Sequence, residues 1–187
     1  MLKKLDINLV VKIITISLVV ALIYFWQVNI SIFEFNREQI LHGEIWRIIT
    51  GHFVHLNFEH FFFNAASLIV VSIIFRSKIN ITSLLLLSVF FSILISFLVL
   101  LLYPNIDWFN GFSGVLHAIF SCLCIQSLTE DRMFKIMMAI LLSKVTMENI
   151  NFFKLSEFAL VELHLLGVIV GSLLAVYQLR IKNINNK

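Results

Sequence analysis

A serine and a histidine stand far apart in this 187-residue chain, each within a long apolar stretch. Ser113 lies in the segment 111–114 (GFSG), and His164 begins the segment 164–167 (HLLG). Reactive polar side chains are costly inside hydrocarbon, so they usually mark a functional site there. A serine, a histidine base and hydrogen-bond donors for an oxyanion are the components of serine-type peptide hydrolysis. The pattern therefore indicates proteolysis within a membrane.

Ser113 is the expected nucleophile. Gly111 and Gly114 flank it, and they would permit a tight turn and a close approach of the backbone. The backbone N–H of Ser113 would lie near a helix N-terminus, where it could donate to an oxyanion. The alternative is that these small residues only pack two membrane helices together.

His164 is the expected general base. Gly167 and Gly171 follow it at i+3 and i+7, on the same helical face, and would let this helix approach a neighbour closely. That approach could bring the imidazole to Ser113. The alternative is a histidine that packs between helices and hydrogen-bonds a carbonyl.

A third, acidic member of the site is not expected. Glu162 precedes His164 by two residues, so it points to roughly the opposite side of the helix. No other acidic residue within an apolar span has a clear path to His164. The sequence therefore predicts a Ser–His dyad rather than a triad. Lys144 and Glu148 form an i, i+4 pair whose role, as a latch or as a substrate contact, stays open.

His60 and Asn64 are candidate oxyanion donors. They stand at i and i+4 and share one helical face; the alternative is a polar pair that bonds a neighbouring helix. His55 lies just before this helix and is expected to support the loop there. His117 follows Ser113 by one turn, and it could orient the base or only pack.

A zinc site is the competing interpretation of the histidines His52, His55 and His60. Their spacing lacks the H-E-x-x-H arrangement that places two ligands and a base on one helical face. We therefore expect no metal and no cofactor.

The composition indicates a membrane protein with one domain over residues 1–187. About 60% of the residues are hydrophobic and 13% are charged, with 19 phenylalanines and one proline. The net charge of +3 is too small and dispersed to indicate nucleic-acid binding. Cys122 and Cys124 match no zinc or redox spacing and are expected to be small apolar residues of a helix.

Six apolar stretches are long enough, or nearly so, to cross a bilayer as helices. They cover about 9–28, 58–75, 81–103, 112–128, 133–145 and 158–179. The third has no charged residue and is expected to face lipid. Lysine and arginine are concentrated on the side that holds both chain ends, which predicts cytoplasmic termini and a site near the outer leaflet.

These residues together resemble the rhomboid intramembrane serine proteases, in order, spacing and placement on helices. The residues that carry the resemblance are Glu44, Trp46 and Arg47 of the segment 44–47 (EIWR), His55, His60, Asn64, the segment 111–114, and the segment 164–167 with Gly171. The resemblance implies an all-α, six-helix rhomboid fold, Ser113 as nucleophile and His164 as base.

The resemblance also implies roles for the surrounding residues. His60, Asn64 and the Ser113 N–H would form the oxyanion hole. The segment 44–47 would lie in a loop between the first two helices, where Arg47 pairs with Glu44 or a carbonyl. The fifth helix and the loop after it would be the gate for substrate.

One position distinguishes a branch of this family. Many rhomboids have a tyrosine one turn after the nucleophile, where this chain has His117. With the segment 50–60, this resembles the rhombosortase branch, which implies bacterial single-pass substrates with a C-terminal Gly-Gly motif, a membrane helix and a basic end. The site would then open to the periplasmic side of a bacterial inner membrane. The rival function is a catalytically silent rhomboid-like protein that binds transmembrane helices without cutting them.

Overall fold

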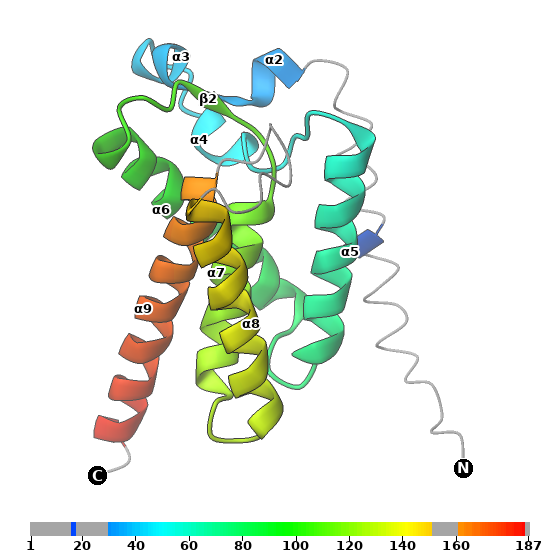
Figure 1. The fold of residues 1–187 in the computed structure, drawn as a ribbon. Helices are drawn as coiled ribbons and strands as arrows, with labels where there is room; N and C mark the ends of the chain where they lie inside the picture. The colour runs from blue at the N-terminus through cyan, green and yellow to red at the C-terminus, as the bar shows by residue number, and fades with distance from the viewer. Residues whose placement is uncertain (1–15, 18–29, 151–160, 186–187) are drawn as a thin grey trace.

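The computed structural model describes residues 16–17, 30–150 and 161–185, and its main part is a group of long helices (Figure 1). They are α5 (Phe58–Ile74), α6 (Ile81–Leu102), α7 (Ser113–Gln126), α8 (Arg132–Asn149) and α9 (Val161–Asn185). The helix α7 packs against each of the other four. The all-α class is confirmed, while the predicted first span lies outside the described residues except at 16–17.

Polar residues begin several of these helices. The side chains of Asn57, Asn80 and Asp131 accept backbone N–H groups of the first turns of α5, α6 and α8. The helix α8 continues to Asn149, four residues beyond the end of the predicted fifth span. This added turn carries Glu148.

Short elements cover one end of the helices (Figure 1). They are α2 (Ile30–Phe33), β1 (Phe35–Asn36), α3 (Arg37–Leu41), α4 (Arg47–Thr50) and β2 (Trp108–Phe109). The strands pair antiparallel with Phe35 opposite Phe109, and these rings stack at 4.3 Å. The Arg37 guanidinium donates to four carbonyls at and after the end of α6, those of Val99, Leu100, Tyr103 and Ile106. It thus bonds acceptors that a helix end leaves unpaired.

The helix α6 does not simply face lipid, which corrects the prediction for the third span. One face is buried along its whole length, through Leu84, Ser88, Phe91, Ser92, Ile95, Ser96 and Val99. The i, i+3 and i+4 spacing of these residues is that of a packed helical face. Only the other side, with Leu86 and Phe97, is exposed.

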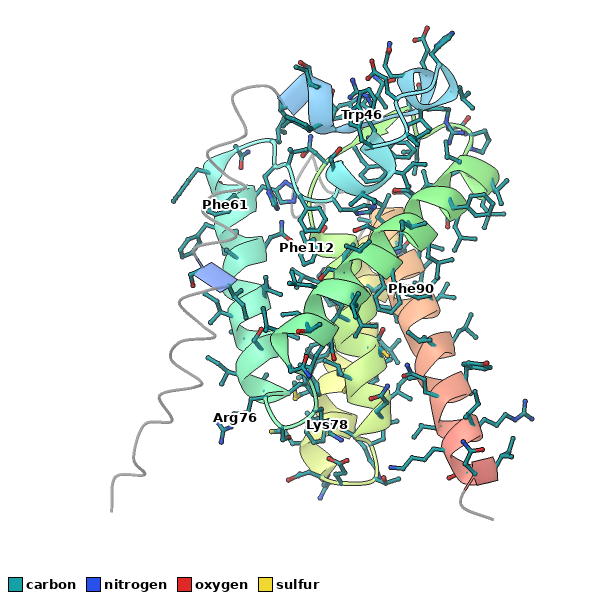
Figure 2. All side chains as sticks on the ribbon, turned by 180° about the vertical axis from the view of Figure 1, so that it is seen from behind. Trp46, Phe61, Arg76, Lys78, Phe90 and Phe112 are labelled. Atoms are coloured by element: carbon teal, nitrogen blue, oxygen red, sulfur yellow. The ribbon has the colours of Figure 1, made fainter. Side chains whose placement is uncertain are left out.

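The outer surface suits a lipid environment. By length and composition, α6 and α9 could each cross a membrane, and α5 and α7 are shorter apolar helices. Large apolar side chains such as Phe63, Leu86 and Val176 are exposed. Figure 2 shows Arg76 and Lys78 at the opposite end of the helices from Trp46.

Candidate active site

Ser113 and His164 lie side by side at the covered end of the helices. Ser113 is the first residue of α7, and His164 lies in the first turn of α9. The Ser113 Oγ is 2.9 Å from His164 Nε2, a hydrogen-bond distance. Two residues separated by 51 positions thus form the contact that a serine nucleophile and its base require.

Three glycines allow this contact. A Cβ on Gly167 would lie 2.2 Å from the Gly114 carbonyl oxygen, and one on Gly171 would lie 2.1 Å from the Ala118 carbonyl oxygen. A Cβ on Gly114 would lie 3.2 Å from the Leu163 carbonyl oxygen. Backbone therefore meets backbone along the contact of α7 with α9, which is the close approach that the glycine spacing predicts.

His117 lies beneath the base. Its ring stacks on that of His164, with centroids 4.3 Å apart and planes inclined by 12°. Its Nδ1 is 2.6 Å from the Ser113 carbonyl oxygen, and its Nε2 is 2.8 Å from Lys144 Nζ. A carbonyl only accepts and an ammonium only donates, so Nδ1 carries the proton and Nε2 accepts.

An acidic side chain does reach His164, so the expectation that none would is wrong. The Glu148 Oε2 lies 3.0 Å from His164 Nδ1, and its Oε1 lies 3.0 Å from Lys144 Nζ. The i, i+4 pair seen in the sequence is thus confirmed, and its location is the far side of the imidazole from Ser113. Glu148 was missed because the predicted span ended at Val145, one turn too early. The available signal was a charged pair at the end of an apolar helix.

The backbone before Ser113 is shaped around His60. Gly111 has φ +112°, and a Cβ there would lie 2.3 Å from His60 Cε1. Only glycine fits this conformation and this distance without strain. The His60 ring therefore lies against the segment that leads into Ser113, where an oxyanion donor would be needed.

The other two residues of this region have mainly local contacts. The Asn64 side-chain amide donates to the His60 carbonyl at 2.9 Å. The His55 ring meets the His60 ring edge-on, with centroids 5.1 Å apart, so His55 supports His60. The oxyanion hole of His60, Asn64 and the Ser113 N–H stays a prediction.

His52 lies apart from the candidate site. Its Nε2 is 3.0 Å from the Ser96 hydroxyl, which donates to the Ile48 carbonyl. Burial lowers the pKa of His52 to about 3 and that of His55 to about 3. In the described ranges, no three His, Cys, Asp or Glu side chains gather as a metal site would need.

Arg47 makes the contacts that the resemblance implied, with Glu44 and with backbone carbonyls. Its buried guanidinium contacts Glu44 Oε2 at 2.6 Å and the carbonyls of Ser31 and Glu34 at 2.8 Å and 2.9 Å. The Trp46 indole donates to the Ile32 carbonyl at 3.2 Å. These bonds fix α4 and α2 together over the end of the helices.

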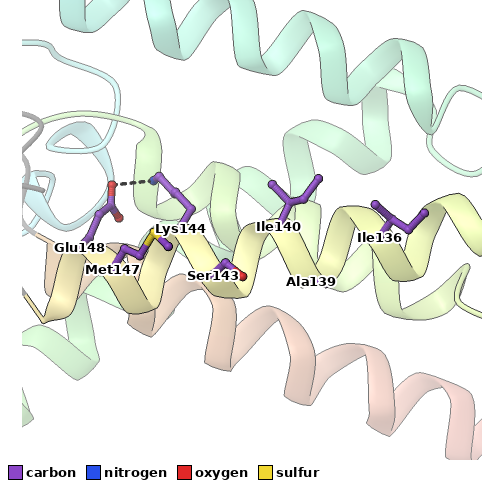
Figure 3. A pocket seen from close by; sticks show the side chains of 7 residues that line it. All are labelled: Ile136, Ala139, Ile140, Ser143, Lys144, Met147 and Glu148. Carbon is purple, nitrogen blue, oxygen red and sulfur yellow. Dashed lines mark ion pairs between the residues drawn. The ribbon is translucent and has the colours of Figure 1, made fainter. Parts of the chain in front are cut away.

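A groove of about 490 Å³ runs along α8 to the site. Its lining is mostly apolar and ends at a charged pair: Ile136, Ala139, Ile140, Ser143, Met147, Lys144 and Glu148. Figure 3 shows the ion pair of Lys144 with Glu148 at one end of the row formed by Ile136 and Ile140. The apolar surface along α8 therefore ends beside the carboxylate that contacts His164.

The fold and the site define a class of membrane protein, a helical domain with a serine–histidine pair at the end of its packed helices. The family model of the Rhomboid domain matches residues 42–181, which is most of the chain. The chain belongs to the rhomboid family, whose members are generally intramembrane serine proteases, and it is an integral membrane protein. The comparison with curated proteins finds no match.

Proposed function

We propose that the protein is a serine-type intramembrane endopeptidase. The observation that carries this proposal is the 2.9 Å contact between Ser113 Oγ and His164 Nε2. The alternative, a silent relative that only binds helices, would not need a nucleophile and a base in contact. This contact favours an endopeptidase over a protein that only binds helices.

The proposed reaction passes one proton through His164. His164 Nε2 takes the Ser113 hydroxyl proton as Oγ attacks the scissile carbonyl carbon. It then gives that proton to the leaving amine, which leaves an ester on Ser113. A water molecule, deprotonated by the same nitrogen, attacks the ester, and the acid product departs as Ser113 regains its proton.

The negative charge that develops on the carbonyl oxygen needs donors. Ser113 begins α7. The preceding residue, Phe112, has no side-chain acceptor to cap the N–H groups at this helix end. The N–H groups of the first turn can therefore donate to an oxyanion. We propose the His60 ring, held against Gly111, as a further donor, with Asn64 beside it.

We further propose a rhombosortase-like substrate. A single-pass protein would place its helix in the apolar groove along α8 and present unwound backbone to Ser113. A Gly-Gly segment suits this step, because glycine lowers helix stability by about 1 kcal/mol per residue. The site would face the periplasmic side of a bacterial inner membrane, with both termini in the cytoplasm.

The experiment compares wild-type and Ser113→Ala protein, purified and reconstituted in liposomes. Each is incubated with a substrate that has a C-terminal Gly-Gly, a membrane helix and a basic tail, and with a general rhomboid substrate. We expect Ser113-dependent cleavage of the first substrate only. Cleavage of both would support a protease of broader specificity and contradict the branch. Cleavage of neither by folded protein would contradict the proposed enzyme.

A further inference from the structure

A continuous chain of polar contacts extends from Ser113 across three helices. It runs from Ser113 Oγ to His164 at 2.9 Å, from His164 Nδ1 to Glu148 at 3.0 Å, and from Glu148 to Lys144 at 3.0 Å. Lys144 then contacts His117 at 2.8 Å, and His117 returns to the Ser113 carbonyl at 2.6 Å. The series of contacts therefore begins at the Ser113 hydroxyl and ends at the Ser113 carbonyl.

We propose that Glu148 is a positioning residue that makes the site a Ser113–His164–Glu148 triad. This inference rests on the proposed function, because it assigns Glu148 a role toward the base of that reaction. Glu148 contacts His164 and Lys144 and does not contact the Ser113 hydroxyl. It acts through His164.

The contact of Glu148 selects the tautomer of His164. An ionised carboxylate can only accept, so the His164 Nδ1 must carry the proton that it donates to Glu148. The other nitrogen, Nε2, is then the acceptor that faces the Ser113 hydroxyl. This is the tautomer that a general base requires.

Lys144 explains why the carboxylate is needed. Its Nζ lies 3.4 Å from His164 Nδ1, and an ammonium group can only donate hydrogen bonds. Without Glu148, this ammonium would favour an unprotonated Nδ1 that accepts its hydrogen bond. The ring proton would then lie on Nε2, and Nε2 could not accept the Ser113 proton. It would also repel the imidazolium that forms when His164 takes the Ser113 proton.

Burial makes the two members of the ion pair unequal. The Glu148 side chain is 6% exposed, whereas that of Lys144 is 37% exposed. The ammonium can turn toward the groove, but the carboxylate is held between α8 and α9. In so poorly solvated a place, the attraction of Glu148 for the imidazolium is stronger than it would be in water. Glu148 therefore orients His164 and stabilises its charged form.

The central test is Glu148→Gln in the full-length reconstituted protein. Glutamine keeps the shape, loses the charge and can offer N–H to His164. We expect kcat to fall roughly 100-fold or more with KM changed by less than about threefold, since the variant alters the base and leaves the apolar surface along α8 unchanged. The matched control is Glu162→Gln, which removes the same charge two residues from His164 and should leave kcat within about threefold of the wild type.

Two further variants separate positioning from packing. Glu148→Asp restores a carboxylate and should recover at least about tenfold in kcat over Glu148→Gln. The double variant Glu148→Gln, Lys144→Met removes the ammonium that Glu148 had balanced, so it should be faster than Glu148→Gln alone. A double variant no faster than the single one would contradict the role assigned to Lys144.

The ¹⁵N resonances of the imidazole rings give a readout that a structural role would not move. In the wild type, His164 should be protonated at Nδ1, and Glu148→Gln should shift the population toward protonation at Nε2. The inference is overturned if wild-type His164 is protonated at Nε2, or if folded Glu148→Gln keeps kcat within about threefold. Should Glu148→Gln fail to fold, the wild-type resonances decide. Absence of Ser113-dependent cleavage in the wild type would instead contradict the proposed function.

Discussion

The helices α9 and α8 both bring side chains to the candidate site, but they are held to α7 in different ways. At Gly167 and Gly171, α9 meets the backbone of α7 so closely that a Cβ would lie 2.2 Å and 2.1 Å from carbonyl oxygens. α8 reaches the site through Lys144 and Glu148, and its outer surface lines a groove. Backbone packing therefore fixes the distance between nucleophile and base, whereas side chains set the state of the base.

The largest effect should come from the contact of α7 with α9. In Gly167→Ala the new methyl group meets the Gly114 carbonyl, so the two helices must separate and Ser113 must leave His164. A displacement of about 1 Å can cost roughly 100-fold in rate. We expect kcat to fall by at least that factor in a reconstituted cleavage assay.

The control for this variant is Ile169→Ala on the exposed side of α9, which should leave the rate nearly unchanged. If Gly167→Ala retained more than half of the wild-type rate, the distance between nucleophile and base would not depend on this contact.

A smaller effect is expected where α8 meets α7 through His117. His117→Phe keeps a ring to stack on His164 but loses the bonds to Ser113 and Lys144. We expect kcat to fall about tenfold with KM unchanged, because two hydrogen bonds are lost and the stacking is kept.

His117→Tyr is the matched variant, since its hydroxyl can accept from Lys144. It should be faster than His117→Phe and should change the preference between Gly-Gly and general substrates. Equal rates for both variants and the wild type would mean that His117 only packs.

A third prediction concerns a region that belongs to neither helix. Burial holds the pKa of His52 and of His55 at about 3, below the ordinary value of 6.5. Below pH 6.5 the unfolded chain takes up protons that the folded chain does not, so stability falls as the pH falls. Each histidine should cost about 2 kcal/mol between pH 7 and pH 5.

Thermal unfolding followed by tryptophan fluorescence measures this effect. The variant His55→Phe keeps a ring against His60 and should lose less stability than the wild type over the same pH range. An equal loss in both proteins would assign the pH dependence to other groups.

The smallest effect is expected from chelators. The proposed chemistry uses Ser113, His164 and Glu148, so a chelating agent should leave kcat unchanged within error. A rate that fell with chelator and returned with zinc would contradict a mechanism based on α7, α8 and α9 side chains alone.

The contrast between α9 and α8 also explains what the sequence could predict. Ser113 and His164 stand out because polar side chains are rare in apolar spans. The glycines three and seven residues after His164 predict a close contact between helices. Both signals lie within one helix or one short segment. Residue type and helical spacing were therefore enough to find them.

Glu148 could not be found in the same way. Its contact with His164 depends on where α8 ends and how that helix lies against α9, and neither follows from spacing within one helix. The buried face of α6 was missed for a similar reason. Its serines at 88, 92 and 96 are uncharged, so they hardly lower the hydrophobicity of the span and do not distinguish one face from the other. Contacts between helices decide both features.

The most direct test of the account is covalent labelling with a fluorophosphonate, which reacts with a serine that is activated by a base. Wild-type, Ser113→Ala and His164→Ala proteins would be treated in liposomes, and the modified residue identified by mass spectrometry. We predict modification of Ser113 in the wild type and none in either variant. Folded wild-type protein that is not labelled, or equal labelling of Ser113 in His164→Ala, would contradict the claim that His164 activates Ser113.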